Sequence, residues 1–116
     1  MSKRKDLQRM YNFVGNYAAH FALYGSERER EATVYLEQAE DIAMSRSWNQ
    51  YDIAEFKLHA MRRAESEIKR RLPEIRVDIR EKNQYLKKAE DYIDGFITKN
   101  MAKAKRTPKI NADGSQ

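Results

Sequence analysis

The sequence predicts an all-α protein, a compact bundle of three to four amphipathic helices followed by a basic C-terminal tail. Apolar residues recur every three or four positions along most of the chain, which is the spacing of one face of an α-helix. Charged residues make up 35% of the 116 residues, while only four residues are glycine and two are proline. Such a composition is typical of long surface helices, and the length suits one domain.

The first helix is predicted between residues 7 and 24. One apolar stripe runs along it with alternating spacings of three and four, and Gly25 is a natural stop because the residue after a helix often needs a positive φ. The stripe consists of Leu7, Met10, Val14, Tyr17, Phe21 and Tyr24.

A second helix is expected to begin at a capping box formed by Ser26 and Glu29. The helical pattern of apolar residues weakens around residues 45–47, and Asn49 can cap the helix that follows. The residues predicted to face inward are Ala32, Tyr35, Leu36, Ala39, Ile42 and Ala43.

The third helix follows Asn49, and Pro73 leaves two alternatives for its end. Either a fourth helix starts at Pro73 and folds back, or one long kinked helix runs from about 50 to about 104. We favour the break, because a turn lets the apolar stripes face each other. The stripe of the third helix is Tyr51, Ala54, Leu58, Met61, Ile68 and Leu72. It stays in phase through Ile75 and Ile79 and resumes at Leu86, Ala89, Ile93, Phe96 and Ile97.

The predicted domain organisation is a helical bundle over residues 1–105 and a polar tail over 106–116 that we expect to be flexible. The chain has no cysteine, which suits a reducing compartment. No stretch resembles a signal peptide or approaches the ~20 apolar residues of a membrane span. We therefore expect a cytoplasmic protein without a membrane partner.

The net charge of +5 is unevenly distributed. Residues 26–56 carry three basic and eight acidic side chains, whereas residues 57–88 carry eleven basic and five acidic ones. Pairing between neighbouring helices explains such alternation without any partner. A binding interpretation makes the basic side chains a surface for an acidic protein or for phosphates. The candidate binding residues are Arg62, Arg63, Lys69 and Arg70 in this block and Lys99, Lys103, Lys105, Arg106 and Lys109 near the end.

Trp48 is a further candidate, since it stands at a predicted helix boundary. Tryptophan there either closes the end of the core or serves as an exposed anchor for a partner. We favour the core position and keep the anchor as the alternative.

No catalytic signature appears. His20 and His59 are the only imidazoles, and Glu55 and His59 share a helical face but lack the further ligands of a metal centre. Glycine-rich phosphate loops and nucleophile elbows are missing. The sequence therefore predicts no enzyme, no metal and no cofactor, with an enzyme centred on His59 as the weakest alternative.

The leading functional hypothesis is a small binding or regulatory protein that docks on another protein through charged helical faces. Its size and basic ends resemble accessory proteins of phages or mobile elements. The main alternative is a nucleic-acid-binding regulator or packaging protein that uses the basic 57–88 face and the basic termini. The leading hypothesis also includes self-association through an amphipathic face, because long stripes readily form oligomeric bundles.

Overall fold

The computed structural model describes residues 2–102 and confirms the all-α class. Its helices are α1 (Lys3–Tyr24), α2 (Glu29–Met44), α3 (Gln50–Arg71) and α4 (Lys82–Phe96). Short 3₁₀ turns cover Gly25–Arg28, Leu72–Ile75 and Ile79–Glu81, and the π-helical segment η4 (Ile97–Ala102) follows α4. The predicted tail and the predicted domain boundary at residue 105 lie outside the described residues.

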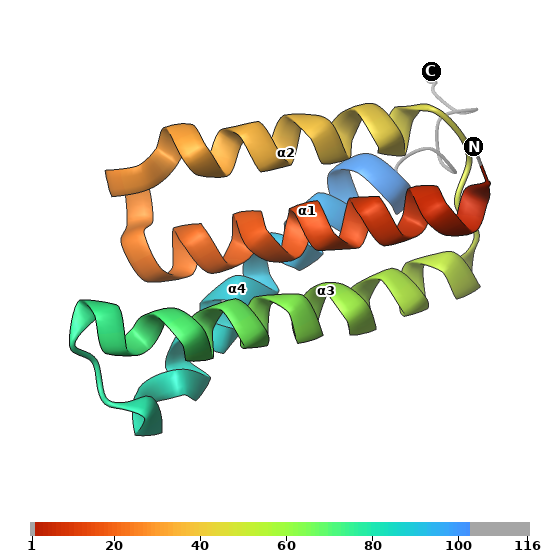
Figure 1. Ribbon diagram of the computed structural model, residues 1–116. Helices are drawn as coiled ribbons and strands as arrows, with labels where there is room; N and C mark the ends of the chain where they lie inside the picture. The colour runs from red at the N-terminus through yellow and green to blue at the C-terminus, as the bar shows by residue number, and fades with distance from the viewer. Residues whose placement is uncertain (1, 103–116) are drawn as a thin grey trace, which may run out of the picture.

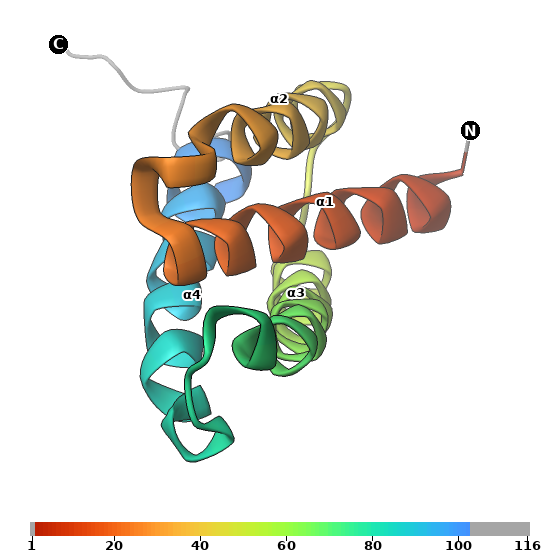
Figure 2. The ribbon, with the colours of Figure 1, turned by 60° about the vertical axis from the view of Figure 1, so that its left-hand side comes forward.

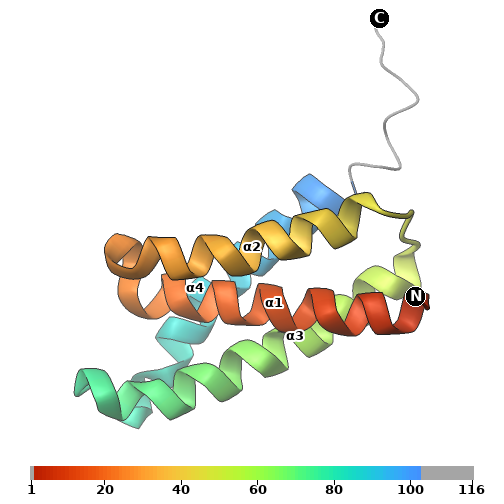
Figure 3. The ribbon, with the colours of Figure 1, turned by 45° about the horizontal axis from the view of Figure 1, so that its top comes forward.

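Helix α1 is the centre of the bundle. It lies between α2 and α3, which run along opposite sides of it (Figures 1 and 3), while α4 crosses at one side (Figure 2). Met10 and Val14 of the predicted stripe are fully buried, but so are Ala18 and Ala19. Because three helices surround α1, its small residues are buried as well as its apolar stripe.

The core contains the only tryptophan. Trp48 is 1% exposed, and its indole N–H donates a hydrogen bond to the carbonyl oxygen of Ala43 at 2.9 Å. The core position is therefore confirmed, and the alternative of an exposed anchor is wrong. The other large side chains that are fully buried in the core are Phe56, Met10, Ile68, Leu72, Ile93, Met101 and Val14.

In the turn between α1 and α2, the helix stop at Gly25 agrees with the prediction, but the start of α2 does not. Gly25 ends α1 with φ 57°, and its N–H donates to the carbonyl oxygen of Phe21. The capping box at Ser26 is wrong, because residues 25–28 form a 3₁₀ turn and α2 starts at Glu29 without a side-chain cap. The Ser26 carbonyl accepts the N–H of Glu29 within that turn.

The start of α3 confirms the predicted cap. The Asn49 side chain accepts from the backbone N–H of Asp52 at 2.8 Å, and the Asp52 carboxylate accepts from the backbone N–H of Asn49 at 2.9 Å. This reciprocal pair satisfies two N–H groups that the first turn of a helix leaves without partners.

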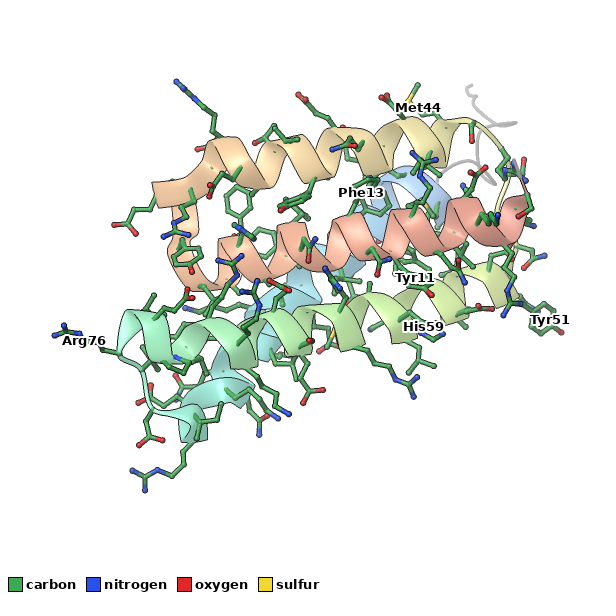
Figure 4. All side chains as sticks on the ribbon, in the orientation of Figure 1. Tyr11, Phe13, Met44, Tyr51, His59 and Arg76 are labelled. Carbon is green, nitrogen blue, oxygen red and sulfur yellow. The ribbon has the colours of Figure 1, made fainter. Side chains whose placement is uncertain are left out.

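The chain breaks near Pro73, so the single long helix is excluded. Helix α3 ends at Arg71, a 3₁₀ turn contains Pro73, and Arg76 has φ 60°, which reverses the chain. Arg76 lies at the tip of this corner (Figure 4). The fourth helix starts at Lys82 rather than at Pro73, and Ile79, expected in the stripe, is 51% exposed.

The buried face of α3 differs from the predicted one in the first half of the helix, while Ile68 and Leu72 of the predicted stripe are fully buried. Tyr51 is 76% and Leu58 49% exposed, whereas Phe56, Ala60 and Ala64 are fully buried. The reason is the close approach of α1, since small residues on α3 let the two backbones come together. The buried faces of α2 and α4 agree with the predicted pattern. Their buried residues are Ala32, Ala39, Ile42, Ala43, Ala89, Ile93 and Phe96.

Candidate functional site

Two lysines of the basic 57–88 block form ion pairs between helices. Lys57 of α3 contacts Asp94 at 2.9 Å and Glu90 at 3.1 Å on α4, and hydrogen bonds to these carboxylates raise the pKa of Lys57. Lys82 of α4 contacts Glu65 of α3 at 2.7 Å, and this hydrogen bond lowers the pKa of Glu65. These pairs join α3 to α4 and do not join the basic 57–88 block to the acidic 26–56 block, because α1 lies between α2 and α3 (Figure 1).

A second group of arginines surrounds Glu67, which is only 8% exposed. Arg70 donates to its carboxylate at 2.7 Å and Arg71 at 3.1 Å, while Arg63 lies 3.9 Å away and also donates to Asn16 at 3.0 Å. Burial alone would raise the pKa of Glu67, but the hydrogen bonds from Arg70 and Arg71 bring it below its usual value. The candidates Arg63 and Arg70 therefore help to neutralise a buried carboxylate.

The remaining candidates are not brought together. Arg62 and Lys69 are exposed on α3, whereas Lys99 belongs to η4 and lines a different surface. The other four basic candidates, Lys103, Lys105, Arg106 and Lys109, lie outside the described residues.

The surface that Lys99 lines is a cleft between α2 and α4, which we call the α2–α4 cleft. It has a volume of about 160 Å³. Tyr17 of α1 contributes its floor, and the walls come from α2, α4 and η4. The lining residues are Tyr17, Leu36, Glu40, Asp91, Tyr92, Gly95, Phe96, Lys99 and Asn100.

Two aromatic residues of the cleft lining, Tyr17 and Tyr92, contact each other and also contact Phe21. The ring centroid of Tyr92 lies 5.7 Å from that of Tyr17 and 5.3 Å from that of Phe21, and Tyr17 and Phe21 are 5.4 Å apart. Tyr92 is 36% exposed, so the cluster is open to solvent at α4. An adjoining hollow shares Tyr92 and Asp91 and extends the cleft along Phe21 toward Gly25.

Carboxylates stand on both walls of the cleft. Glu40 of α2 and Asp91 of α4 form no ion pair within residues 2–102. Burial raises the pKa of Tyr17, and the nearby Tyr92 and Glu40 raise it further. The cleft lining therefore combines aromatic faces with two carboxylates and one lysine, Lys99, which leaves an excess of one negative charge. Aromatic faces beside carboxylates are the chemistry that receives an ammonium or guanidinium group.

Gly95 keeps the cleft open. It is exposed within α4, and a Cβ atom built on it would have no neighbouring heavy atom within 4 Å. A wider hollow of about 550 Å³ lies along Ser26–Glu37, but its lining comes only from α2 and the turn before it. The α2–α4 cleft is the better candidate because four elements converge on it.

The two histidines have structural neighbours. The ring of His59 stacks on that of Tyr11 with centroids 4.8 Å apart (Figure 4), and His20 Nδ1 lies 2.9 Å from the carbonyl oxygen of Asn16. Within the described part of the chain, no three histidine, aspartate or glutamate side chains are grouped so that they could bind a metal ion.

Comparison of the chain with protein-family models, with curated proteins and with solved structures finds no match. Among the helices of residues 2–102, none has both the length and the apolar character needed to cross a membrane.

Of the residues that line the cleft, the sequence predicts only Lys99 as a candidate for binding. The sequence pattern places Tyr17 on the core stripe of the first helix, and Glu40 counts only among the acidic side chains of residues 26–56. Two signals were present in the sequence: Tyr92 lies off the apolar stripe of the last helix, and Gly95 interrupts a helical pattern without ending it.

Proposed function

We propose that this chain is a binding protein without catalytic activity, which docks on another protein by receiving a basic side chain in the α2–α4 cleft. The observation that carries the proposal is the pair of carboxylates without ion-pair partners, Glu40 and Asp91, above the partly exposed rings of Tyr17 and Tyr92.

A lysine or arginine of a partner fits this arrangement in three ways. Its charge is attracted by carboxylates on both walls, and its cationic head can lie over an aromatic ring. Its aliphatic stem can cover Leu36 and Phe96, which also line the cleft. Such aromatic and charged contacts contribute strongly to protein–protein affinity when they are shielded from water.

The test is affinity capture from a lysate of the source cells with matched variants. Gly95→Leu places a side chain in the cleft, while Lys87→Leu adds the same side chain at an exposed position of α4 outside the cleft lining. We expect the native chain and Lys87→Leu to retain the same protein, and Gly95→Leu to lose it. If the native chain and both variants retain the same protein equally well, the cleft is not the docking site.

Nucleic-acid binding remains the second candidate. It is supported by exposed basic side chains that form no ion pair or hydrogen bond within residues 2–102, among them Arg62, Lys69, Arg76 and Lys87. Binding to random duplex DNA and to RNA across a salt series tests it. A loss of affinity equivalent to about four or more released counterions would support it, and no binding near physiological salt would exclude it.

A further inference from the structure

The outer face of α3 carries apolar side chains that the bundle does not cover. Helix α3 packs closely on α1 where Ala60 approaches Gly15, and it contacts α4 through the stacked rings of Phe56 and Phe96 and through the ion pairs of Lys57 and Glu65. The side that faces neither helix is open to solvent. Tyr51 at its N-terminal end points away from the molecule (Figure 4).

Within residues 51–66, four exposed residues share this side, and the exposed Lys69 continues it toward the end of α3. With about 100° between successive residues of an α-helix, Tyr51, Glu55, Leu58 and Arg62 fall within about 60° of one another. Tyr51 and Leu58 are 76% and 49% exposed, and Glu55 and Arg62 are exposed beside them. We call this set the α3 ridge. It joins an apolar centre to one acidic and one basic side chain.

The charges of the ridge are complementary to those of a second, antiparallel copy. If a two-fold axis passes between Leu58 and His59, Glu55 lies opposite Arg62 of the partner subunit, and Arg62 lies opposite the partner's Glu55. Leu58 then packs near the axis against the partner's Leu58. A parallel arrangement would place Glu55 opposite Glu55 of the partner subunit, which is unfavourable.

Neither charge is engaged within the subunit. Glu55 and Arg62 form no ion pair or hydrogen bond in residues 2–102, in contrast to Lys57, Arg63 and Glu65 of the same helix. The reciprocal pairs of a dimer would therefore form without breaking a contact inside the bundle.

We propose that two copies of this chain associate through the α3 ridge as an antiparallel dimer with reciprocal Glu55–Arg62 ion pairs. This inference goes beyond the proposed function and uses a face other than the α2–α4 cleft, so either can fail while the other holds. The overlap of residues 51–66 corresponds to about 24 Å of helix at about 1.5 Å per residue. A small interface of this kind predicts reversible association.

Sedimentation equilibrium of the full chain tests the dimer, over concentrations from roughly 1 μM to 1 mM. The native chain is expected to shift from monomer to dimer mass within this range. Glu55→Arg and Arg62→Glu each place like charges opposite each other, and each is expected to raise the dissociation constant by about tenfold or more. The double variant Glu55→Arg/Arg62→Glu restores opposite charges and is expected to return to within about threefold of the native value.

Glu37→Arg is the control, because it reverses an exposed charge on α2. It should leave the association unchanged, and circular dichroism should show the same helix content in every variant. A native chain that stays monomeric throughout would overturn the proposal. So would single variants that associate like the native chain, a double variant that does not recover, or a ridge that binds nucleic acid in place of a second copy.

Discussion

Gly15 of α1 and Arg63 of α3 face each other so closely that no side chain fits on Gly15. A Cβ atom at Gly15 would lie 2.6 Å from Cβ and 2.7 Å from Cγ of Arg63, and 2.9 Å from the carbonyl oxygen of Ala60. Arg63 also donates to Asn16 at 3.0 Å beside this crossing. The close approach decides which face of α3 is buried, and it therefore leaves the α3 ridge on the outside.

Gly15→Ala is accordingly expected to destabilise the protein. The new methyl group must push α1 away from the backbone of α3, which costs about 1–3 kcal/mol of unfolding free energy, as overpacking does elsewhere. Gly95→Ala is the control, because a Cβ there meets nothing within 4 Å. It should stabilise the protein by about 0.5–1 kcal/mol through helix propensity. Urea denaturation measures both, and an equal effect of the two substitutions would contradict the close contact.

The single tryptophan offers a direct test of the core. Trp48 is buried and donates to Ala43, so we expect a blue-shifted fluorescence emission that moves to longer wavelength on unfolding. Trp48→Ala should lower the unfolding free energy by about 3–5 kcal/mol because of the cavity it leaves. An emission spectrum typical of exposed tryptophan in the folded protein would contradict the structure.

Acid should weaken the arginine cluster around Glu67. The pKa of Glu67 is lower in the folded chain than its usual value, so the stability it contributes is fully present at neutral pH. That stability is lost as the pH falls below about 5 and through the folded pKa. In Glu67→Gln, the loss of unfolding free energy between about pH 6 and pH 3 should be smaller than in the native chain. Glu37→Gln, at an exposed position, should keep the native pH profile, and identical profiles for all three would refute a role of Glu67.

The electrostatics of the cleft can be followed at Tyr17. Its pKa is raised by burial and by the neighbouring Tyr92 and Glu40. Glu40→Gln removes a negative charge that opposes phenolate formation, so it should lower the pKa of Tyr17 without returning it to its usual value. Carbon-13 NMR of the labelled tyrosine rings resolves this titration. An unchanged Tyr17 pKa in Glu40→Gln would show that Glu40 does not influence the cleft floor.

The elements of this fold follow from local signals, but their mutual packing does not. Gly25, Asn49 and Pro73 mark chain reversals through backbone chemistry that needs no tertiary context. In α3, the series with Tyr51 and Leu58 fits helical spacing as well as the series with Phe56 and Ala60. Only the close approach of α3 to Gly15 of α1 decides between them.

The α2–α4 cleft could not be predicted from the sequence either. Tyr17 and Tyr92 are 75 positions apart in the numbering, and they meet only because α4 crosses α1. Glu40 and Asp91 become one site through the same crossing. In the basic block, a count of charges could not separate Lys57 and Arg70, which are paired, from Arg62, which is exposed and forms no pair within residues 2–102.

The most direct test of the central claim is an NMR titration of the nitrogen-15-labelled chain with a blocked Gly-Arg-Gly peptide. We expect amide shifts to concentrate at Tyr17, Glu40, Asp91 and Gly95, to be absent with a Gly-Glu-Gly peptide, and to vanish in Gly95→Leu. Shifts spread evenly over the acidic surface, or shifts that persist unchanged in Gly95→Leu, would contradict a cleft that receives a basic side chain.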